Sequence, residues 1–166
     1  MDSLKRIAPA AYVVAALLVL ITLMDYLVNA WPLRPDDVDW RYDRIGLGST
    51  YLLLPLLGCL IASITAAWFP HPRVSKLLGK FLWTGALLLL IASGTFVLDS
   101  ILVRRIAGPE TRWATPWSFV FTTAKLLAAT AGLVVLARGN LRAAQAASES
   151  VGPRRREPAR PVIGQS

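Results

Sequence analysis

Four long apolar stretches, separated by shorter polar segments, dominate the hydrophobic pattern of this chain. They span Ile7–Val28, Tyr51–Phe69, Phe81–Val103 and Trp117–Ala137. Each has about 20 residues, the length that an α-helix needs to cross a hydrocarbon layer of roughly 30 Å. Long central parts of them, such as Ala11–Met24 and Ala86–Leu98, contain no charged side chain, whereas a surface helix of a soluble protein carries charges along one face. We therefore predict an all-α integral membrane protein with a four-helix transmembrane bundle.

The composition supports this class and indicates a single domain. Hydrophobic residues make up 55% of the chain and charged residues 17%, which is too apolar for an ordinary soluble domain. We predict one transmembrane domain over residues 1–147, in which Leu141–Ala147 prolong the last helix into the cytosol. Residues 148–166 are predicted to form a disordered basic tail, because they contain few apolar side chains. Arg154, Arg155 and Arg156 in this tail are expected to attract anionic lipid headgroups.

The positions of Lys and Arg indicate the orientation. With a cytoplasmic N-terminus, eleven cations lie inside and six outside, or seven and six when only those close to the helix ends are counted. We predict a multi-pass protein of the cell membrane, in a bacterial inner membrane, with both termini cytoplasmic. Lys5 and Arg6 before an apolar stretch are also typical of a signal peptide. We favour an uncleaved first helix, because the run of about 18 residues before Asp25 is longer than the apolar part of a signal peptide.

The first outer loop, residues 29–50, is the longest connection and is rich in polar and aromatic residues. Pro35-Asp36-Asp37 can cap a short helix, since a carboxylate at this position accepts hydrogen bonds from free N–H groups. We predict a short interfacial helix here, with a contact surface that comprises Asp36, Asp37, Asp39, Trp40 and Arg41. The acidic spacing lacks the glycine and the closing glutamate of a calcium loop, so a solvated cluster paired with arginine is favoured over a metal site.

Three charged residues fall inside the apolar stretches. Asp25, Asp99 and Lys125 each cost about 2.5–3.5 kcal/mol to insert into a membrane, so they are expected to have partners. Their depths and helix faces predict one hydrogen-bonded cluster, which Thr22, Asn29 and Thr95 share. Two hypotheses remain open for this cluster. It is a structural clasp, or one Asp stays protonated in a dry site and exchanges a proton during transport.

Two further features concern helix packing. Gly58, Ala62 and Ala66 form a stripe of small residues, which lets helices approach closely. Pro55 lies one turn inside the second apolar stretch, where it should kink the helix, because proline lacks the N–H group that a helix interior needs.

The residue inventory argues against several kinds of chemistry. His71 is the single histidine and Cys59 the single cysteine, so a bis-histidine haem site and a thiol pair are excluded, and no zinc or phosphate-loop motif occurs. We expect no cofactor, no metal and no nucleic acid, and a non-enzymatic membrane subunit or accessory protein that contacts the lipid bilayer and another membrane protein or a second copy of itself. The alternative is a small oligomeric transporter or channel that uses Asp25, Asp99 and Lys125. A lipid-modifying enzyme ranks last.

Overall fold

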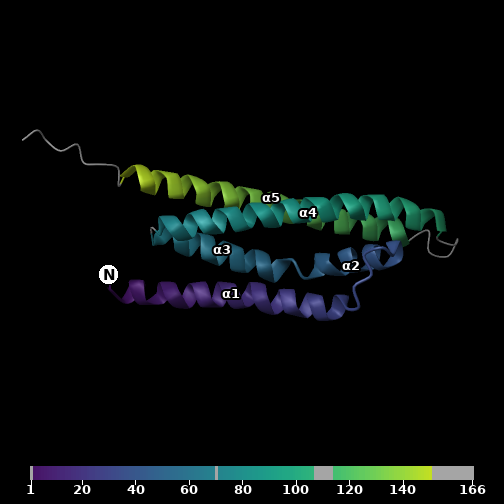
Figure 1. The fold of residues 1–166 in the computed structure, drawn as a ribbon, viewed down its shortest axis with the longest axis horizontal. Coiled ribbons are helices and arrows are strands. Elements are labelled where there is room, and N and C mark those ends of the chain that lie inside the picture. The colour runs from purple at the N-terminus through teal and green to yellow at the C-terminus, as the bar shows by residue number, and fades with distance from the viewer. Residues whose placement is uncertain (1, 70, 107–113, 151–166) are drawn as a thin grey trace, which may run out of the picture.

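The computed structural model describes residues 2–69, 71–106 and 114–150, and every element in these ranges is an α-helix. The helices are α1 (Asp2–Ala30), α2 (Val38–Thr50), α3 (Leu53–Trp68), α4 (Pro72–Ile106) and α5 (Ala114–Ser150). They all run along the long axis of the molecule, and α1 begins at the same end at which α5 finishes (Figure 1). The predicted all-helical class is therefore confirmed.

Three of these helices are long and apolar enough to cross a membrane by themselves. These are α1, α4 and α5, whereas α2 and α3 reach the required length only as a pair, bent by 48° at a short break. The described chain thus has three candidate spans, or four if the bent pair counts as one. Large apolar side chains cover the outside of these helices; Val28, Leu53 and Val135 are 70%, 76% and 69% exposed. Apolar exposure on this scale is typical of a surface that faces lipid.

The break between α2 and α3 has a local cause in Pro55. This residue is the third of α3, where a missing N–H costs nothing, and its ring would clash with a helical carbonyl group four residues earlier, at Tyr51. The backbone N–H of Tyr51 closes α2 on the carbonyl of Gly48 at 3.0 Å, and that of Leu56 bonds to Leu52 at 3.1 Å. The sequence predicts a kink within one helix over residues 51–69; the structure instead breaks the helix just before the proline.

Helix α2 begins where the predicted cap lies. The Asp37 side chain accepts hydrogen bonds from the backbone N–H groups of Asp39 and Trp40, at 3.0 and 3.3 Å. The helix packs against α4 and α5 and is followed almost at once by α3 (Figure 1). The short helix that the sequence predicts in this loop is therefore present, and it packs on the longer helices.

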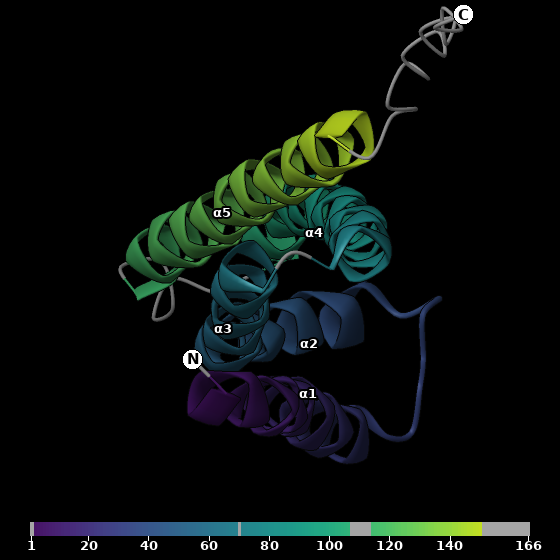
Figure 2. The same ribbon diagram turned by 90° about the vertical axis from the view of Figure 1, so that its left-hand side faces the viewer.

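The helices form layers rather than a bundle around one axis. Viewed along the molecule, α4 and α5 lie side by side, α3 and α2 come next, and α1 lies outermost (Figure 2). Helix α1 packs on α3 and makes at most marginal contact with α4 and α5. The apolar core lies between α3, α4 and α5, where Cys59, Leu82, Ala86, Leu133 and Ala137 are buried. The predicted four-helix bundle is thus supported in part: the helices are present, and the α2–α3 pair lies between α1 and the last two helices.

Small residues allow the two closest helix contacts. A side-chain carbon added at Gly58 would lie 2.7 Å from the carbonyl oxygen of Ala15, so the backbones of α1 and α3 approach each other closely at this point. The same addition at Gly79 would lie 2.8 Å from Leu141, where α4 meets α5. Gly58 and Ala66 of the predicted stripe are buried and Ala62 is half-buried, in agreement with a packing face.

Helices α4 and α5 are longer than the apolar stretches that predict them. Helix α4 begins at Pro72 rather than at residue 81, and α5 continues through Leu141–Ala147 to Ser150. Residues 148–150, predicted as the start of the disordered tail, are helical because α5 keeps packing on α4 beyond the apolar stretch, with Ala144 buried. The rest of the predicted tail, with Arg154, Arg155 and Arg156, lies outside the described residues.

Candidate functional site

The most buried charge on the described helices is Asp99 of α4, which is 3% exposed. Arg41 of α2 binds it with two parallel hydrogen bonds, Nε to Oδ2 at 3.0 Å and Nη2 to Oδ1 at 2.9 Å. The third nitrogen of the same guanidinium, Nη1, donates to the carbonyl of Pro35 at 2.7 Å. Such a bidentate pair between an arginine and a carboxylate is among the strongest polar contacts in proteins. It connects the segment before α2 to α4, and we call it the Arg41–Asp99 clasp.

The depth of the clasp follows from the helix rise. Lys80 on α4 and Arg138 on α5 mark one edge of the apolar region, at the level where Gly79 meets Leu141. Asp99 comes 19 residues after Lys80, which places it about 28 Å further along the axis at 1.5 Å per residue. The clasp therefore lies close to the opposite edge of a hydrocarbon layer about 30 Å thick.

The predicted Asp25, Asp99 and Lys125 cluster is not assembled. Asp25 is exposed on α1, where the amide of Asn29 donates to its carbonyl at 2.9 Å and to its Oδ1 at 3.2 Å. Asn29 also reaches the Tyr51 hydroxyl at 3.4 Å, so these groups hold α1 against the break region. The layer order explains the outcome, because the α2–α3 pair stands between α1 and Asp99.

Two hydroxyl groups of the predicted cluster form hydrogen bonds within their own helices. Thr22 donates to the Leu18 carbonyl at 2.8 Å, and Thr95 donates to the Ile91 and Ala92 carbonyls at 3.2 and 3.0 Å. Such bonds to the preceding turn satisfy a hydroxyl in an apolar medium without a partner on another helix. Sequence analysis correctly selected Asp99 as a charge that needs a partner, but it chose the wrong partners for it.

Lys125 faces a pocket of about 540 Å³ between α2, α4 and α5. Asp43, Thr50, Phe96, Phe121 and Thr122 are among the other residues that line it, and we call it the outer pocket. Its wall toward α4 is aromatic: the Tyr42 and Phe96 rings stack at a centroid distance of 4.8 Å, and Phe96 stacks on Phe119 of α5 at 5.9 Å. Helices α2, α4 and α5 thus meet at one aromatic cluster, beside the charged side chains of Asp43 and Lys125.

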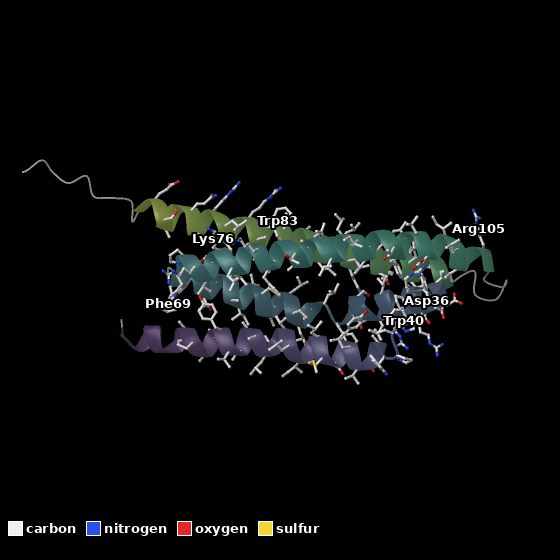
Figure 3. All side chains as sticks on the ribbon, in the orientation of Figure 1. Asp36, Trp40, Phe69, Lys76, Trp83 and Arg105 are labelled. Carbon is white, nitrogen blue, oxygen red and sulfur yellow. The ribbon has the colours of Figure 1, made fainter. Side chains whose placement is uncertain are left out.

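The predicted contact surface of the first outer loop divides into two parts. Asp36 and Asp39 are exposed, whereas Arg41 is engaged in the clasp. Asp36 lies near one end of the molecule (Figure 3). Trp40 is half-buried, and its indole Nε1 is buried without a hydrogen-bond partner in the described structure. Within the described ranges, no three His, Cys, Asp or Glu side chains come together as metal ligands would.

A buried polar contact between α3 and α5 was missed by sequence analysis. The Asn140 amide donates to the Ser63 hydroxyl at 2.9 Å and to the Leu136 carbonyl at 2.8 Å, while the Ser63 hydroxyl donates to the Cys59 carbonyl at 2.7 Å. Asn140 is 6% exposed. It lies three residues after Ala137 and four before Ala144, both buried, and this helical spacing was a signal that it faces the core.

Family models, curated proteins and solved structures were all compared with this chain, and none of them matches it. The fold and the clasp define its class as a small, layered helical protein with three to four candidate membrane spans.

Proposed function

We propose that this chain is a four-span integral membrane protein and that it acts as a non-enzymatic membrane subunit or accessory protein. In this arrangement α1, the α2–α3 pair, α4 and α5 each cross the membrane once, and both termini are cytoplasmic. Helix α1 begins and α5 finishes at the same end of the molecule, which supports an even number of crossings (Figure 1). Charged side chains concentrate toward the two ends, near Lys76 and near Asp36 and Arg105, with apolar side chains between them (Figure 3).

The observation that carries the proposal is a basic surface beyond the apolar region, formed by the first residues of α4 and the last residues of α5. We call these two paired segments, residues 72–80 and 138–150, the basic hairpin. Helix α4 starts eight residues before Lys80, and α5 continues twelve residues after Arg138, which corresponds to about 12 and 18 Å. Its cations are exposed on both helices: Arg73, Lys76, Lys80, Arg138 and Arg142. The close packing of Leu141 against Gly79 holds the two helices together at its base. A protruding, ordered surface with an excess of positive charge is suited to contact an acidic protein surface.

The alternative function, a small oligomeric transporter or channel, requires three charges to share one site. Asp99 is bonded to Arg41, and Asp25 is bonded to Asn29 on the outermost helix. The two carboxylates therefore belong to separate contacts, on different helices. The accessory role needs no such cluster, and for this reason we prefer it.

Copurification from native membranes tests the proposal. We expect a second membrane protein to copurify with the tagged chain. The double variant Lys76→Glu and Arg142→Glu should lose this partner, because two of the five cations of the hairpin are replaced by carboxylates and most of its positive charge is removed. Arg34→Glu is the matched control, since this exposed arginine lies before α2 and far from the hairpin. Recovery of the chain alone, or an equal yield of partner from the double variant, would contradict the accessory role.

A further inference from the structure

The outer pocket holds two opposite charges that do not neutralise each other. Asp43 of α2 and Lys125 of α5 both line it, and both are exposed. Within the described residues, the ion pair that forms is the Arg41–Asp99 clasp, so neither Asp43 nor Lys125 has an ionic partner there. An unpaired charge beside lipid is costly, and a ligand with both signs of charge would relieve the cost at both residues.

The two charges lie at different depths. Lys125 comes 13 residues before Arg138, about 20 Å from the basic hairpin, whereas Asp99 is about 28 Å from it. Asp43 follows Arg41 by two residues and therefore lies near the level of the clasp. Lys125 is thus the deeper charge by several ångströms, and its side chain leans toward the start of α5, which is toward the level of Asp43.

We propose that the outer pocket binds the headgroup of a zwitterionic phospholipid that has a primary amine. The phosphate group contacts the Lys125 ammonium, and the protonated amine contacts the Asp43 carboxylate. This order matches the depths, because in a bilayer the phosphate lies nearer the acyl chains and the amine nearer the water. The hydroxyl of Thr122, on the same wall as Lys125, is available to donate a further hydrogen bond to the phosphate.

The chemistry of the site also discriminates between headgroups. An ethanolamine ammonium offers three N–H donors to the Asp43 carboxylate, while a choline headgroup offers none, so phosphatidylethanolamine should bind better than phosphatidylcholine. Phosphatidylglycerol has a phosphate but no cation, and it would leave Asp43 uncompensated beside a second negative charge. The pocket volume of about 540 Å³ lies within the range of small-molecule binding sites, which is enough for a headgroup and its glycerol.

Native mass spectrometry of the full chain can measure this preference. The protein, purified in a mild detergent, is mixed with equal amounts of phosphatidylethanolamine, phosphatidylcholine and phosphatidylglycerol of identical acyl chains, and the lipid retained by the protein is quantified. We expect about tenfold greater retention of phosphatidylethanolamine, which is the effect of one good charge-assisted hydrogen bond. Equal retention of the three lipids by the wild-type chain would overturn the proposal.

Two variants and two matched controls assign the effect to the pocket. Lys125→Gln should lower retention of all phospholipids, because each of them has a phosphate. Asp43→Asn should abolish only the preference, since phosphatidylglycerol is no longer repelled and the amine loses its negatively charged acceptor. Lys76→Gln and Asp39→Asn make the same chemical changes at exposed positions outside the pocket and should leave the preference as it is. A preference that Asp43→Asn leaves unchanged would place the lipid elsewhere.

A water-soluble competitor separates headgroup recognition from recognition of the whole lipid. Glycerophosphoethanolamine carries the same phosphate and amine without acyl chains, and in excess it should displace the bound lipid. Failure to displace would mean that the acyl chains and not the headgroup select the lipid. The inference rests on the proposed four-span arrangement but not on a protein partner, so a negative copurification result would leave the lipid preference measurable.

Discussion

At the scale of single residues, the Arg41–Asp99 clasp is expected to contribute most to stability. Asp99 is 3% exposed, and both of its carboxylate oxygens accept hydrogen bonds from one guanidinium. Removing one partner of such a pair leaves the other partner without compensation, which costs more than the net contribution of the pair. Asp25 differs because it is exposed and bonds to an amide of its own helix.

The substitution Asp99→Asn should therefore lower the free energy of unfolding by about 2–3 kcal/mol, the range for hydrogen bonds to a charged group. Asp25→Asn, the matched control, should change it by less than about 1 kcal/mol. Titration with a denaturing detergent, followed by circular dichroism, measures both values. Adding Arg41→Gln to Asp99→Asn should cost little more, because the unpaired cation is then removed. Equal losses for Asp25→Asn and Asp99→Asn would argue against a clasp.

The buried contact between Asn140 and Ser63 should matter less. Hydrogen bonds between membrane helices average about 0.6 kcal/mol, and the Asn140 amide keeps its second acceptor, the Leu136 carbonyl, when the Ser63 hydroxyl is removed. We expect Ser63→Ala to lower the free energy of unfolding by about 1 kcal/mol or less. The same detergent titration measures it, and a loss as large as that of Asp99→Asn would contradict the ranking of these two contacts.

At the scale of helices, the contact between α1 and α3 depends on the absence of a side chain at Gly58. An added carbon there would lie 2.7 Å from a backbone oxygen of α1, which cannot move as a flexible side chain can. Gly94 on α4 and Gly132 on α5 have no atom within 4 Å of the same position. The three glycines thus share a helical backbone but differ in their surroundings.

Gly58→Ala should consequently lower the free energy of unfolding by about 1–3 kcal/mol, as is usual for overpacked sites. Gly94→Ala should raise it by up to about 1 kcal/mol, because alanine is the better helix former. The opposite signs make the pair informative, and detergent titration of both variants measures them. A stabilising Gly58→Ala would mean that α1 does not pack on α3 at this distance.

At the scale of the whole molecule, the proposed four-span arrangement requires the bent α2–α3 pair to cross the membrane rather than return to the side from which it came. A crossing puts Asp36 and Arg73 on opposite sides, whereas a re-entrant loop puts them on the same side. Both side chains are exposed, and the single native cysteine, Cys59, is buried.

Labelling of single cysteines with a membrane-impermeant maleimide decides between these arrangements. In a Cys59→Ala background, we expect Asp36→Cys to react in intact cells, and Arg73→Cys to react only after the membrane is opened. Reaction of both cysteines in intact cells would indicate a re-entrant pair and three crossings. Reaction of Arg73→Cys alone would reverse the orientation of the whole protein.

Much of the fold follows from local properties of the sequence. The positions and apolarity of the stretches that became α1, α4 and α5, and the cap at Asp37, depend on residues near one another along the chain, and each appears in the structure. The effect of Pro55 is local as well, although a break before the proline replaces the predicted kink. Hydrophobicity and backbone propensity act within a few turns, so one sequence is enough to find them.

The partners of the charged residues depended on tertiary structure. The sequence could show that Asp99 needs a compensating group, but it pointed to a cluster with Asp25 and Lys125 and placed Arg41 on the surface of the outer loop. The layer order decided among them, since the α2–α3 pair lies between α1 and α4 and brings Arg41 to Asp99. Which helix neighbours which, and how each is rotated, depends on the packing of small residues such as Gly58 and Gly79 across distant segments, and no local pattern contains that information.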